Sequence, residues 1–351
     1  MSAAGPGATR RGTSKVTVLP FGHSFECPDG ESILEAALRQ GLFLRYGCRH
    51  GGCGTCKAVL SDGDVEGEGS SFALSSRERA EGVVLLCSAR PVGDCTVDVE
   101  AMELTDDEFR AGDQVGAFET EVVALEELTH DTRGLTLALR DPGTMTFGAG
   151  QFVNLEIPGT DEVRSYSIAN APHACDRIEL VVKLLPGGTF SGHLRSRLAV
   201  GDRLRVFGPL GELKLRLSHR RVLMVAGGSG LAPFLSMLRH LEARGKPRDV
   251  DLVYGARRVR DLYRVEELER LAAVLPGVRF VPALSEPQGE PWAGERGLVT
   301  DVIARTYPTL EGYDAYLAGP PAMIEATVPV LTGLGVRPAN VRFDAFVPAR
   351  P

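Results

Sequence analysis

The amino-acid sequence predicts a multidomain chain that combines the α+β and α/β fold classes. Its 351 residues are enough for two or three domains of roughly 150 residues each. The spacing of the apolar residues changes twice along the chain. It first indicates a short β-rich stretch, then regularly spaced strands, and finally strands that alternate with helices. With 43% hydrophobic and 24% charged residues, the composition is that of folded domains. The expected segments are a disordered leader (1–14), a first domain (15–102), a linker (103–113), a second domain (114–217) and a third domain (218–351).

The first domain is predicted to be a small sheet with a helix packed across it. Residues 16–27 contain two short apolar strands around a turn. Ser32 and Glu35 then form the capping-box pattern that starts helices, and the apolar helix that follows stops at Gly41. Beyond a glycine-rich loop, short strands and a second short helix (75–81) complete the domain.

The second and third domains differ in the period of their apolar residues. Between residues 115 and 215 one short strand follows another, and only 191–198 has a helical pattern, which is typical of a barrel or a sandwich. From residue 221 onward, apolar strands alternate with helical patterns such as that of 231–241. This alternation predicts a parallel α/β sheet.

Negative charge is concentrated in the first domain. Residues 14–108 hold eight Lys or Arg against seventeen Asp or Glu, whereas residues 109–351 hold 29 of each kind. This asymmetry predicts a docking face, with a merely soluble acidic surface as the alternative. The net charge of −7 argues against non-specific DNA binding, and no apolar run approaches the ~20 residues that cross a bilayer. The leader lacks the apolar stretch of a secretory signal, so we expect a cytoplasmic protein.

Four of the seven cysteines lie within residues 48–87, and their spacing predicts an iron–sulfur site. Cys-x4-Cys-x2-Cys, followed by a fourth cysteine about thirty residues later, is the plant-type [2Fe–2S] pattern. Three thiolates from one loop bind two irons only if the backbone wraps closely, and Gly51, Gly52 and Gly54 remove side chains at that point. The predicted ligands are Cys48, Cys53, Cys56 and Cys87.

Two other metal sites fit the cysteines less well. A four-cysteine zinc site normally has two Cys-x2-Cys pairs, and this segment has one. Cys48-Arg-His50 matches the first half of a Rieske site, but no second Cys-x2-His follows, so we expect His50 to be a loop residue near the cluster. Cys27, Cys95 and Cys175 have no such spacing and are expected to be ordinary small apolar residues.

The segments YGCRHGGCGTCKAVLSDGDVEG (46–67) and LLCSARP (85–91) resemble the N-terminal ferredoxin domain of bacterial oxygenase reductases. The resemblance is closest to the reductase components of soluble di-iron monooxygenases of the propane, phenol or methane type, and it extends over nearly the whole chain from residue 16. It implies a β-grasp ferredoxin domain, an antiparallel Greek-key β-barrel that binds FAD, and a parallel α/β domain that binds the nicotinamide nucleotide.

Two segments of the second domain resemble the FAD site of the ferredoxin–NADP reductase superfamily. One is RSYS (164–167), which by itself is also an ordinary strand with alternating faces. The other is VKLLPGGTFSGHL (182–194), where glycines allow a close backbone approach and a serine can cap a helix whose N-terminus favours a pyrophosphate. The resemblance implies that Arg164 pairs with the pyrophosphate, Tyr166 packs on the isoalloxazine and Ser167 lies near its N5. Its further implied FAD contacts are Lys183, Gly188, Thr189, Ser191 and Phe346.

The third domain contains two nucleotide-binding patterns. VAGGSGLAP (225–233) lies between an apolar strand and an amphipathic helix, where glycines let a diphosphate approach the backbone and the helix N-terminus supplies positive potential. It departs from the G-x-G-x-x-G fingerprint but resembles the G-G-x-G-x-A-P pattern of the same superfamily, and GPPAM (319–323) resembles its second motif. A plain strand–turn–helix explains either loop alone. The implied nucleotide contacts are Gly227, Gly228, Gly230, Pro233, Gly319, Pro320 and Met323.

Three features leave the resemblance incomplete or open. The family usually has Cys just before the second motif, close to the nicotinamide, and this chain has Ala318. Phe346 resembles the family's terminal aromatic that covers the flavin, with a core phenylalanine as the alternative. Arg257 and Arg258 are placed to meet a 2′-phosphate, but NADH-using members have a similar segment followed by Asp-Leu, as at Asp261, so we favour NADH over NADPH.

The implied function is electron transfer from NADH to FAD, then to [2Fe–2S], and then to a partner di-iron monooxygenase that hydroxylates a hydrocarbon or a phenol. FAD is needed because a nicotinamide gives two electrons together, whereas the cluster accepts one. No side chain is expected to be a catalytic acid, base or nucleophile, because the cofactors supply the chemistry. We expect the partner to dock on the acidic ferredoxin face, around Glu66 and Glu68, and the reductase to be a monomer when free.

Two alternatives remain open at this point. The same three domains occur in reductases of Rieske-type aromatic ring-hydroxylating dioxygenases. Otherwise, the chain is an iron–sulfur binding or sensor protein in which both nucleotide patterns are vestigial.

Overall fold

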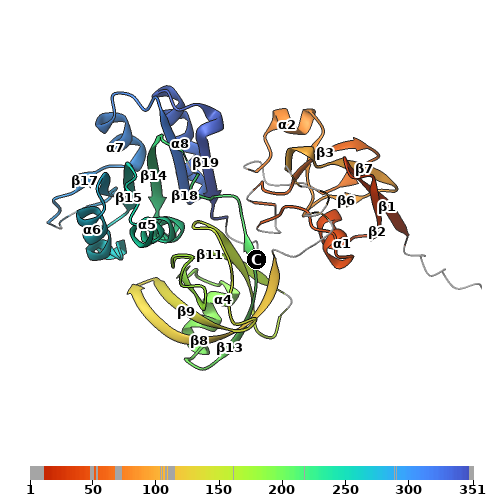
Figure 1. Ribbon diagram of the computed structural model, residues 1–351, viewed down its shortest axis with the longest axis horizontal. Coiled ribbons are helices and arrows are strands. Elements are labelled where there is room, and N and C mark those ends of the chain that lie inside the picture. The colour runs from red at the N-terminus through yellow and green to blue at the C-terminus, as the bar shows by residue number, and fades with distance from the viewer. Residues whose placement is uncertain are drawn as a thin grey trace, which may run out of the picture. The chain divides into compact units, whose positions relative to one another are not determined.

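The computed structural model divides into two compact units, Met1–Asp113 and Gln114–Pro351 (Figure 1). No helix in the part of the chain that the structure describes is long and apolar enough to cross a membrane. The described residues are 12–47, 51–52, 54–67, 73–102, 104, 106, 109, 115–160, 162–216, 218–287, 289 and 291–347.

The described residues of the first unit form a five-stranded mixed sheet that helix α1 crosses. Its elements are β1 (Thr13–Leu19), β2 (His23–Pro28), α1 (Ile33–Arg39), β3 (Lys57–Asp62), β4 (Val65–Glu66), α2 (Ser76–Ala80), β5 (Val83–Leu85), β6 (Arg90–Pro91), β7 (Cys95–Asp98) and the short 3₁₀ turn η1 (Glu100–Met102). The strand order is β2-β1-β7-β3-β5, in which β1 and β7 pair in parallel and the other neighbours pair antiparallel. Helix α1 buries Ile33 and Leu34 completely against this sheet. The arrangement is the predicted β-grasp fold.

Helices α1 and α2 begin at the residues that the sequence indicates. Ser32 Oγ accepts a hydrogen bond from Glu35 N at 3.3 Å at the start of α1. Helix α2 has a complete capping box, in which Ser75 Oγ accepts from Glu78 N and a Glu78 carboxylate oxygen accepts from Ser75 N at 2.8 Å. Lys57 at the start of β3 binds the same Glu78 at 2.6 Å. Helix α2 is therefore tied to the strand that follows the cysteine loop.

Phe109 belongs to the core of the first unit, although it lies in the segment expected to be a linker. Its side chain is fully buried, and its ring stacks on Phe21 with 4.6 Å between centroids. Its carbonyl accepts a hydrogen bond from Phe43 N at 2.8 Å. Apolar burial thus holds this part of 103–113 against the turn between β1 and β2.

The second unit begins with a six-stranded antiparallel barrel. Its strands are β8 (Gly116–Thr129), β9 (Thr132–Asp141), β10 (Phe152–Glu156), β11 (Val163–Ser167), β12 (Arg177–Lys183) and β13 (Arg203–Leu210), and helix α4 (Thr189–Ser196) lies between β12 and β13. The order β11-β10-β13-β8-β9-β12 is the predicted Greek-key arrangement. A bridge between Ile168 and Leu180 closes the barrel. Its core contains the fully buried Val122, Leu137 and Val206.

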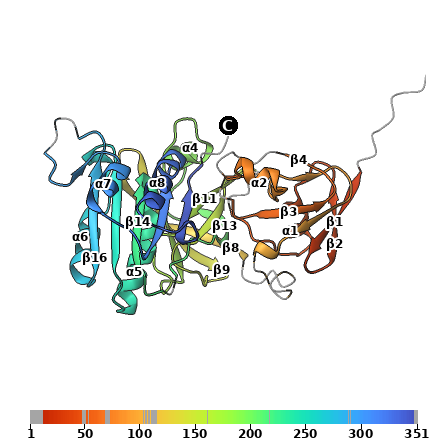
Figure 2. The same ribbon diagram turned by 90° about the horizontal axis from the view of Figure 1, so that it is seen from above.

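The rest of the second unit is the predicted parallel sheet, with helices on both faces. Its strands are β14 (Arg221–Gly227), β15 (Val250–Ala256), β16 (Val278–Leu284), β17 (Glu295–Arg296), β18 (Tyr313–Gly319) and β19 (Val341–Ala345). Its helices are α5 (Ala232–Arg244), α6 (Val265–Val274), α7 (Val299–Thr306) and α8 (Pro321–Gly333), with 3₁₀ turns η2 (Gly228–Leu231), η3 (Val259–Asp261) and η4 (Pro338–Asn340). Figure 2 shows α5 and α6 on one face and α7 and α8 on the other. Covering both faces explains why residues 222–226 of β14 are apolar and fully buried.

The strand order of this sheet places a ligand site at the end of β14. The order is β17-β16-β15-β14-β18-β19, so β14 lies between the strand that follows it and one made much later. Ligands of open α/β sheets bind at the carboxyl ends of strands where the order reverses in this way. The edge strand β19, which apolar patterning does not predict, pairs in parallel with β18 and sets Asp344 opposite Ala318.

Candidate functional site

The two described cluster cysteines lie at the same end of a strand pair. Cys56 precedes β3 and Cys87 follows β5, and these strands pair antiparallel with Lys57 opposite Leu85. Leu86 N donates a hydrogen bond to Cys56 O at 3.0 Å, so the chain brings both cysteines to one edge of the sheet. Both are buried, with 2% and 9% of their surface exposed. Outside the described residues lie Cys48, His50 and Cys53.

The described glycines of the cysteine loop let the backbone wrap tightly. Gly51 and Gly54 have φ values of +77° and +74°, in the left-handed region that favours glycine. A Cβ on Gly54 would lie 3.3 Å from both Ala73 O and Lys57 Cε. Buried thiols beside a closely wrapped loop are the donor set of an iron–sulfur cluster, so the described residues fit the predicted [2Fe–2S] group.

Two other cysteines of the first unit, Cys27 and Cys95, are buried thiols with raised pKa values. Burial raises the pKa of the Cys27 and Cys95 thiols to about 11. Cys27 Sγ also donates a hydrogen bond to Glu31 O at 3.5 Å. A thiol with so high a pKa stays protonated at neutral pH and is a poor nucleophile or ligand. Their environment agrees with the expectation of ordinary small apolar residues.

Strand β11 and helix α4 bring a cation and a helix N-terminus together. Arg164 on β11 forms an ion pair with Glu162 and donates to Val163 O at 2.9 Å. Thr189, the first residue of α4, donates to the same Glu162 carboxylate at 3.4 Å. An arginine next to the amides that open a helix is a suitable donor set for a pyrophosphate. These residues fit the FAD that the resemblance implies.

The next residues of β11 extend this site toward the parallel sheet. The ring of Tyr166 tilts against Phe190 of α4 with 5.6 Å between centroids, and burial raises the pKa of the Tyr166 hydroxyl well above its usual value. Ser167 is buried, and its Oγ lies 3.5 Å from Asp344 Oδ2 on β19. The strand of predicted flavin contacts therefore reaches the edge strand beside β18.

Two predicted flavin contacts have other partners in the structure. Ser191 does not cap α4, because its Oγ accepts a hydrogen bond from Leu185 N at 2.9 Å and the N-cap residue is Gly188. This hydroxyl instead holds the glycine turn that precedes the helix. Lys183 Nζ lies 2.5 Å from Asp131 Oδ2. Although burial raises the pKa of Asp131, the hydrogen bond from Lys183 lowers it overall.

The two nucleotide patterns form one cradle at the carboxyl ends of β14 and β18. A Cβ on Gly230 would lie 2.0 Å from Ala318 O, and a Cβ on Gly319 would lie 2.8 Å from Gly227 O. A Cβ on Gly227 would lie 2.6 Å from Met323 Sδ. Only glycine fits at 230 and 319, so the two loops pack backbone against backbone there, whereas a Cβ on Gly227 would meet the Met323 side chain.

The remaining residues of the cradle fit a dinucleotide. Gly228 has φ +54°, and a Cβ there would meet nothing within 4 Å among the described atoms. Its carbonyl accepts a hydrogen bond from Tyr263 OH at 3.2 Å. Pro233 lies in the first turn of α5, and Pro320 is the N-cap of α8. An open glycine between two helix N-termini is a favourable place for a diphosphate.

Ala318 and Phe346 lie beside this cradle. Ala318, at the position of the family's usual cysteine, is fully buried. Phe346 N donates to Gly319 O at 2.8 Å, and its half-buried ring packs against the core that contains Ala318. The backbone of Phe346 is therefore tied to the second nucleotide loop.

Three residues that contact the predicted site are not singled out by the sequence. They are Glu162, Tyr263 and Asp344, whose partners are Arg164, Gly228 and Ser167. Glu162 and Tyr263 lie outside every recognised motif. Asp344 lies in the terminal segment whose aromatic residue is recognised, so its position was available from that pattern.

Comparisons with known proteins agree with this geometry. Three family models match consecutive parts of the chain: a 2Fe-2S iron-sulfur cluster binding domain at 16–92, an oxidoreductase FAD-binding domain at 119–215 and an oxidoreductase NAD-binding domain at 224–328. These matches confirm the predicted fold class and the three predicted cofactor classes.

Similar proteins match the chain over nearly its whole length. The propane 2-monooxygenase reductase component of Mycolicibacterium goodii is 37% identical over 338 residues, which cover 95% of this chain and 97% of that protein. The phenol 2-monooxygenase reductase component of Pseudomonas sp. (strain CF600) is 41% identical over 90% of this chain and 89% of its own. The crystal structure of an Amycolatopsis cytochrome P450 reductase superposes with a TM-score of 0.79 at 35% identity, covering 96% of this chain and 99% of that one.

Proposed function

We propose that this chain, which belongs to the family of three-domain iron–sulfur flavoprotein reductases of oxygenases, transfers electrons from NADH to an oxygenase partner. The observation that carries the proposal is the backbone contact between Gly230 and Ala318, because it joins the two nucleotide loops into one cradle. The likeness to reductase components over nearly the whole chain supports a reductase over an iron–sulfur sensor.

The chain's own part in this function is to hold three electron carriers. When bound, FAD takes two electrons together from NADH and releases them singly to the [2Fe–2S] cluster. No side chain is assigned as an acid, base or nucleophile. The proposed cluster ligands are Cys48, Cys53, Cys56 and Cys87; the proposed FAD contacts are Arg164, Tyr166, Ser167, Lys183, Gly188, Thr189, Ser191 and Phe346; the proposed nucleotide contacts are Gly227, Gly228, Gly230, Pro233, Gly319, Pro320 and Met323.

The proposed partner is a di-iron monooxygenase that hydroxylates a hydrocarbon or a phenol. The names of the propane and phenol monooxygenase reductase components support a monooxygenase that acts on a hydrocarbon or a phenol, and the resemblance of residues 46–67 supports the di-iron class. Reconstitution of the chain with a di-iron hydroxylase and, separately, with a Rieske-type dioxygenase tests it. Turnover with the Rieske enzyme alone would replace this proposal with the alternative partner.

We place the docking face on the acidic turn between β3 and β4. Asp62, Asp64 and Glu66 are exposed there. Gly63, between the two aspartates, lets this turn pack closely against the backbone of Asp94, because a Cβ on Gly63 would lie 2.5 Å from Asp94 O. Asp94 is also exposed. These carboxylates form a negative surface that steers a basic partner. Glu68 lies outside the described residues.

We propose NADH as the electron donor, in preference to NADPH. Asp261 Oδ2 accepts a hydrogen bond from Arg258 N at 2.9 Å, and Asp261 Oδ1 lies 4.0 Å from Arg260 Nε. This carboxylate repels a 2′-phosphate and competes for nearby guanidinium groups. We further propose that the reductase is monomeric when free and works in the cytoplasm, with a second domain at 114–217 and a third at 218–351. The first domain is larger than the expected 15–102, because β1 begins at Thr13, inside the expected leader, and Phe109 of the expected linker is buried in its core.

A visible spectrum of the purified protein tests the reductase function. We expect flavin bands with iron–sulfur shoulders, and NADH is expected to bleach both. A spectrum that stays free of flavin after reconstitution would contradict the proposal.

The docking face is tested by charge reversal. Changing Glu66 and Glu68 to lysine is expected to slow partner reduction and flatten its salt dependence, while NADH-driven reduction of ferricyanide stays unchanged. Unchanged partner reduction would exclude this face.

A further inference from the structure

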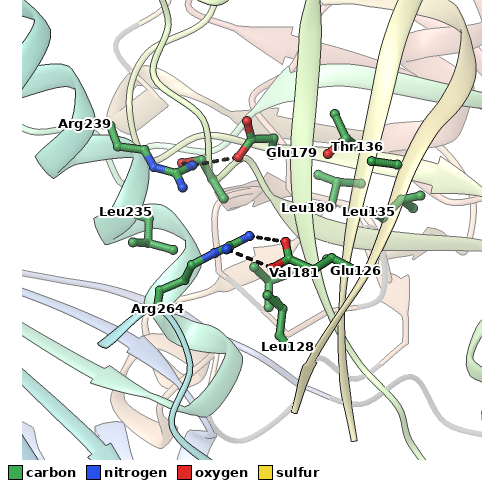
Figure 3. Close-up of a pocket in the computed structure, with 13 residues that line it drawn as sticks. Glu126, Leu128, Leu135, Thr136, Glu179, Leu180, Val181, Leu235, Arg239 and Arg264 are labelled. Carbon is green, nitrogen blue, oxygen red and sulfur yellow. Dashed lines mark hydrogen bonds and ion pairs between the residues drawn. The ribbon is translucent and has the colours of Figure 1, made fainter. Parts of the chain in front are cut away.

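Helix α5 connects the nucleotide cradle to the barrel. It follows η2 directly and so continues the glycine loop. Two of its side chains bond to the barrel, one turn apart. Ser236 Oγ donates to Asn170 O at 2.7 Å, and both residues are buried. Arg239 Nη1 donates to Ala169 O at 3.1 Å and to Glu179 Oε2 at 2.7 Å, and Figure 3 shows its guanidinium directed at Glu179.

The acceptors on the barrel lie just beyond the strand of predicted flavin contacts. Ser167 ends β11, and Ala169 and Asn170 are the second and third residues after it. The Asn170 side chain braces this segment, because its Nδ2 donates to Ala174 O at 3.0 Å and its Oδ1 accepts from Glu179 N at 2.8 Å. Ala169 N also donates to Glu179 O at 2.7 Å. Helix α5 is therefore attached to a firmly bonded part of the barrel.

The guanidinium of Arg239 has little freedom to adapt. Its side chain is 18% exposed, and its Nε and Nη2 donate to the two carboxylate oxygens of Glu267 on α6 at 2.7 and 2.9 Å. This bidentate pair fixes the plane of the group and so aims Nη1 at the barrel. Figure 3 also shows a second ion pair between the two domains, Arg264 with Glu126 of β8. Its side chains are 31% and 50% exposed, more than those of Arg239 and Glu179.

We propose that Ser236 and Arg239 are positioning residues that hold the nucleotide cradle in one register against the flavin strand. This inference rests on the proposed function. In the reaction concerned, a hydride leaves NADH, which becomes NAD⁺, and reduces the flavin by two electrons. Its rate depends steeply on the distance and orientation of the reacting atoms. Because one continuous set of hydrogen bonds joins the cradle helix to the flavin strand, contacts remote from the chemistry control that geometry.

Glu179→Gln and Glu242→Gln form a matched pair of test variants. Each neutralises a carboxylate that binds an arginine, but Glu179 on the barrel binds Arg239, whereas Glu242 on α5 binds Arg270 of α6 and takes no part in the contact with the barrel. With the FAD- and cluster-loaded protein at saturating NADH, we expect Glu179→Gln and Ser236→Ala to slow flavin bleaching about 10- to 100-fold. The NADH concentration that gives half the maximal rate is expected to stay unchanged. Glu242→Gln is expected to stay within about twofold of wild type. Arg239→Lys is expected to keep more of the rate than Arg239→Met.

Hydrogen exchange without NADH supplies a readout that does not depend on turnover. We expect faster amide exchange across 169–179 in Ser236→Ala and Glu179→Gln, but not in Glu242→Gln. Equal bleaching rates in the two glutamine variants, or wild-type exchange in Ser236→Ala, would overturn the inference. If NADH fails to bleach the wild-type flavin, the proposed function is wrong, while the exchange data still decide whether α5 holds the barrel segment.

Discussion

The two ends of the parallel sheet are built from opposite chemistry. At the carboxyl ends, Gly230 and Gly319 leave no room for side chains, and backbone meets backbone. At the amino ends, Asp251 Oδ1 lies 3.0 Å from Arg279 Nε, and Arg279 Nη2 donates to Tyr307 OH at 2.7 Å. The difference shows how one sheet separates two tasks. One end keeps backbone groups close to a ligand, and the other uses side chains to hold neighbouring strands together.

The amino end is a connected network of charges and rings. Asp251 is 5% exposed and also lies 3.8 Å from Arg221. The Arg221 guanidinium lies 5.0 Å from the ring centroid of Tyr313, and that of Arg279 lies 5.3 Å from the ring centroid of Tyr307. A buried carboxylate that binds two strands contributes to stability but touches no predicted ligand contact. Variants at the two ends are therefore expected to separate stability from activity.

Gly230→Ala is expected to have the largest effect, because its Cβ would lie 2.0 Å from a backbone oxygen that cannot move aside alone. We expect stopped-flow bleaching of the flavin by NADH to fall about 100-fold, since the two loops must separate. Gly333→Ala is the control, because a Cβ there meets nothing within 4 Å among the described atoms. A near-wild-type rate in Gly230→Ala would show that the cradle is not needed.

Asp251→Asn is expected to have the largest effect at the amino end, and on stability alone. Losing the charge leaves Arg279 without its buried partner, and we expect this to lower the free energy of unfolding by about 2 kcal/mol. This loss is smaller than for a fully buried ion pair, because the Arg279 side chain is half exposed. Denaturant unfolding measures this loss, and the NADH bleaching rate is expected to stay unchanged. The exposed pair Arg270–Glu242 gives the control, since Glu242→Gln is expected to cost about 0.5 kcal/mol. Slower bleaching with an unchanged free energy of unfolding would contradict the assignment of the amino end to stability.

Gly228→Ala is expected to weaken nucleotide binding at a modest cost in stability. A left-handed φ of +54° costs an alanine about 1–2 kcal/mol, but its Cβ would enter open space in the cradle. We expect the NADH concentration for half-maximal bleaching to rise while the saturated rate is largely kept. An unchanged concentration would mean that the diphosphate lies elsewhere.

Tyr307→Phe is expected to have the smallest effect and to depend on pH. Burial and the charge of Asp251 raise the pKa of Tyr307 above its usual value of about 10. The folded protein therefore keeps this proton while the unfolded chain releases it, so the contribution is complete below pH 10 and is lost as the pH rises further. Phenylalanine removes the hydrogen bond from Arg279, which we expect to cost about 1 kcal/mol at pH 7. It is also expected to make the alkaline loss of stability shallower, as urea unfolding between pH 8 and 11 would measure.

That alkaline decline is not expected to vanish in Tyr307→Phe. Burial also raises the pKa of Tyr254 and Tyr263, which lie near the carboxyl end of the sheet. A decline identical to that of wild type would mean that Tyr307 does not contribute to it.

The parts of the site that are local in sequence are the parts that the sequence predicts. Cysteine spacing and glycines between a strand and a helix are encoded within about ten residues, because a loop needs small residues wherever its backbone packs closely. The bond from Ser236 to Asn170 spans 66 residues, and no local pattern indicates which helix face meets the barrel. The expected cap at Ser191 is wrong for a related reason. The pattern identifies a hydroxyl acceptor, but the fold decides that Leu185 N reaches it.

The contact between Gly230 and Ala318 also joins parts of the chain that are far apart in sequence. These residues are about 90 positions apart, and β18 joins β14 only after β15, β16 and β17 have been synthesised. A chain that has not yet closed this long loop has only half of the cradle. We therefore expect nucleotide binding to require a complete sheet, so that NADH stabilises the folded chain relative to the unfolded chain.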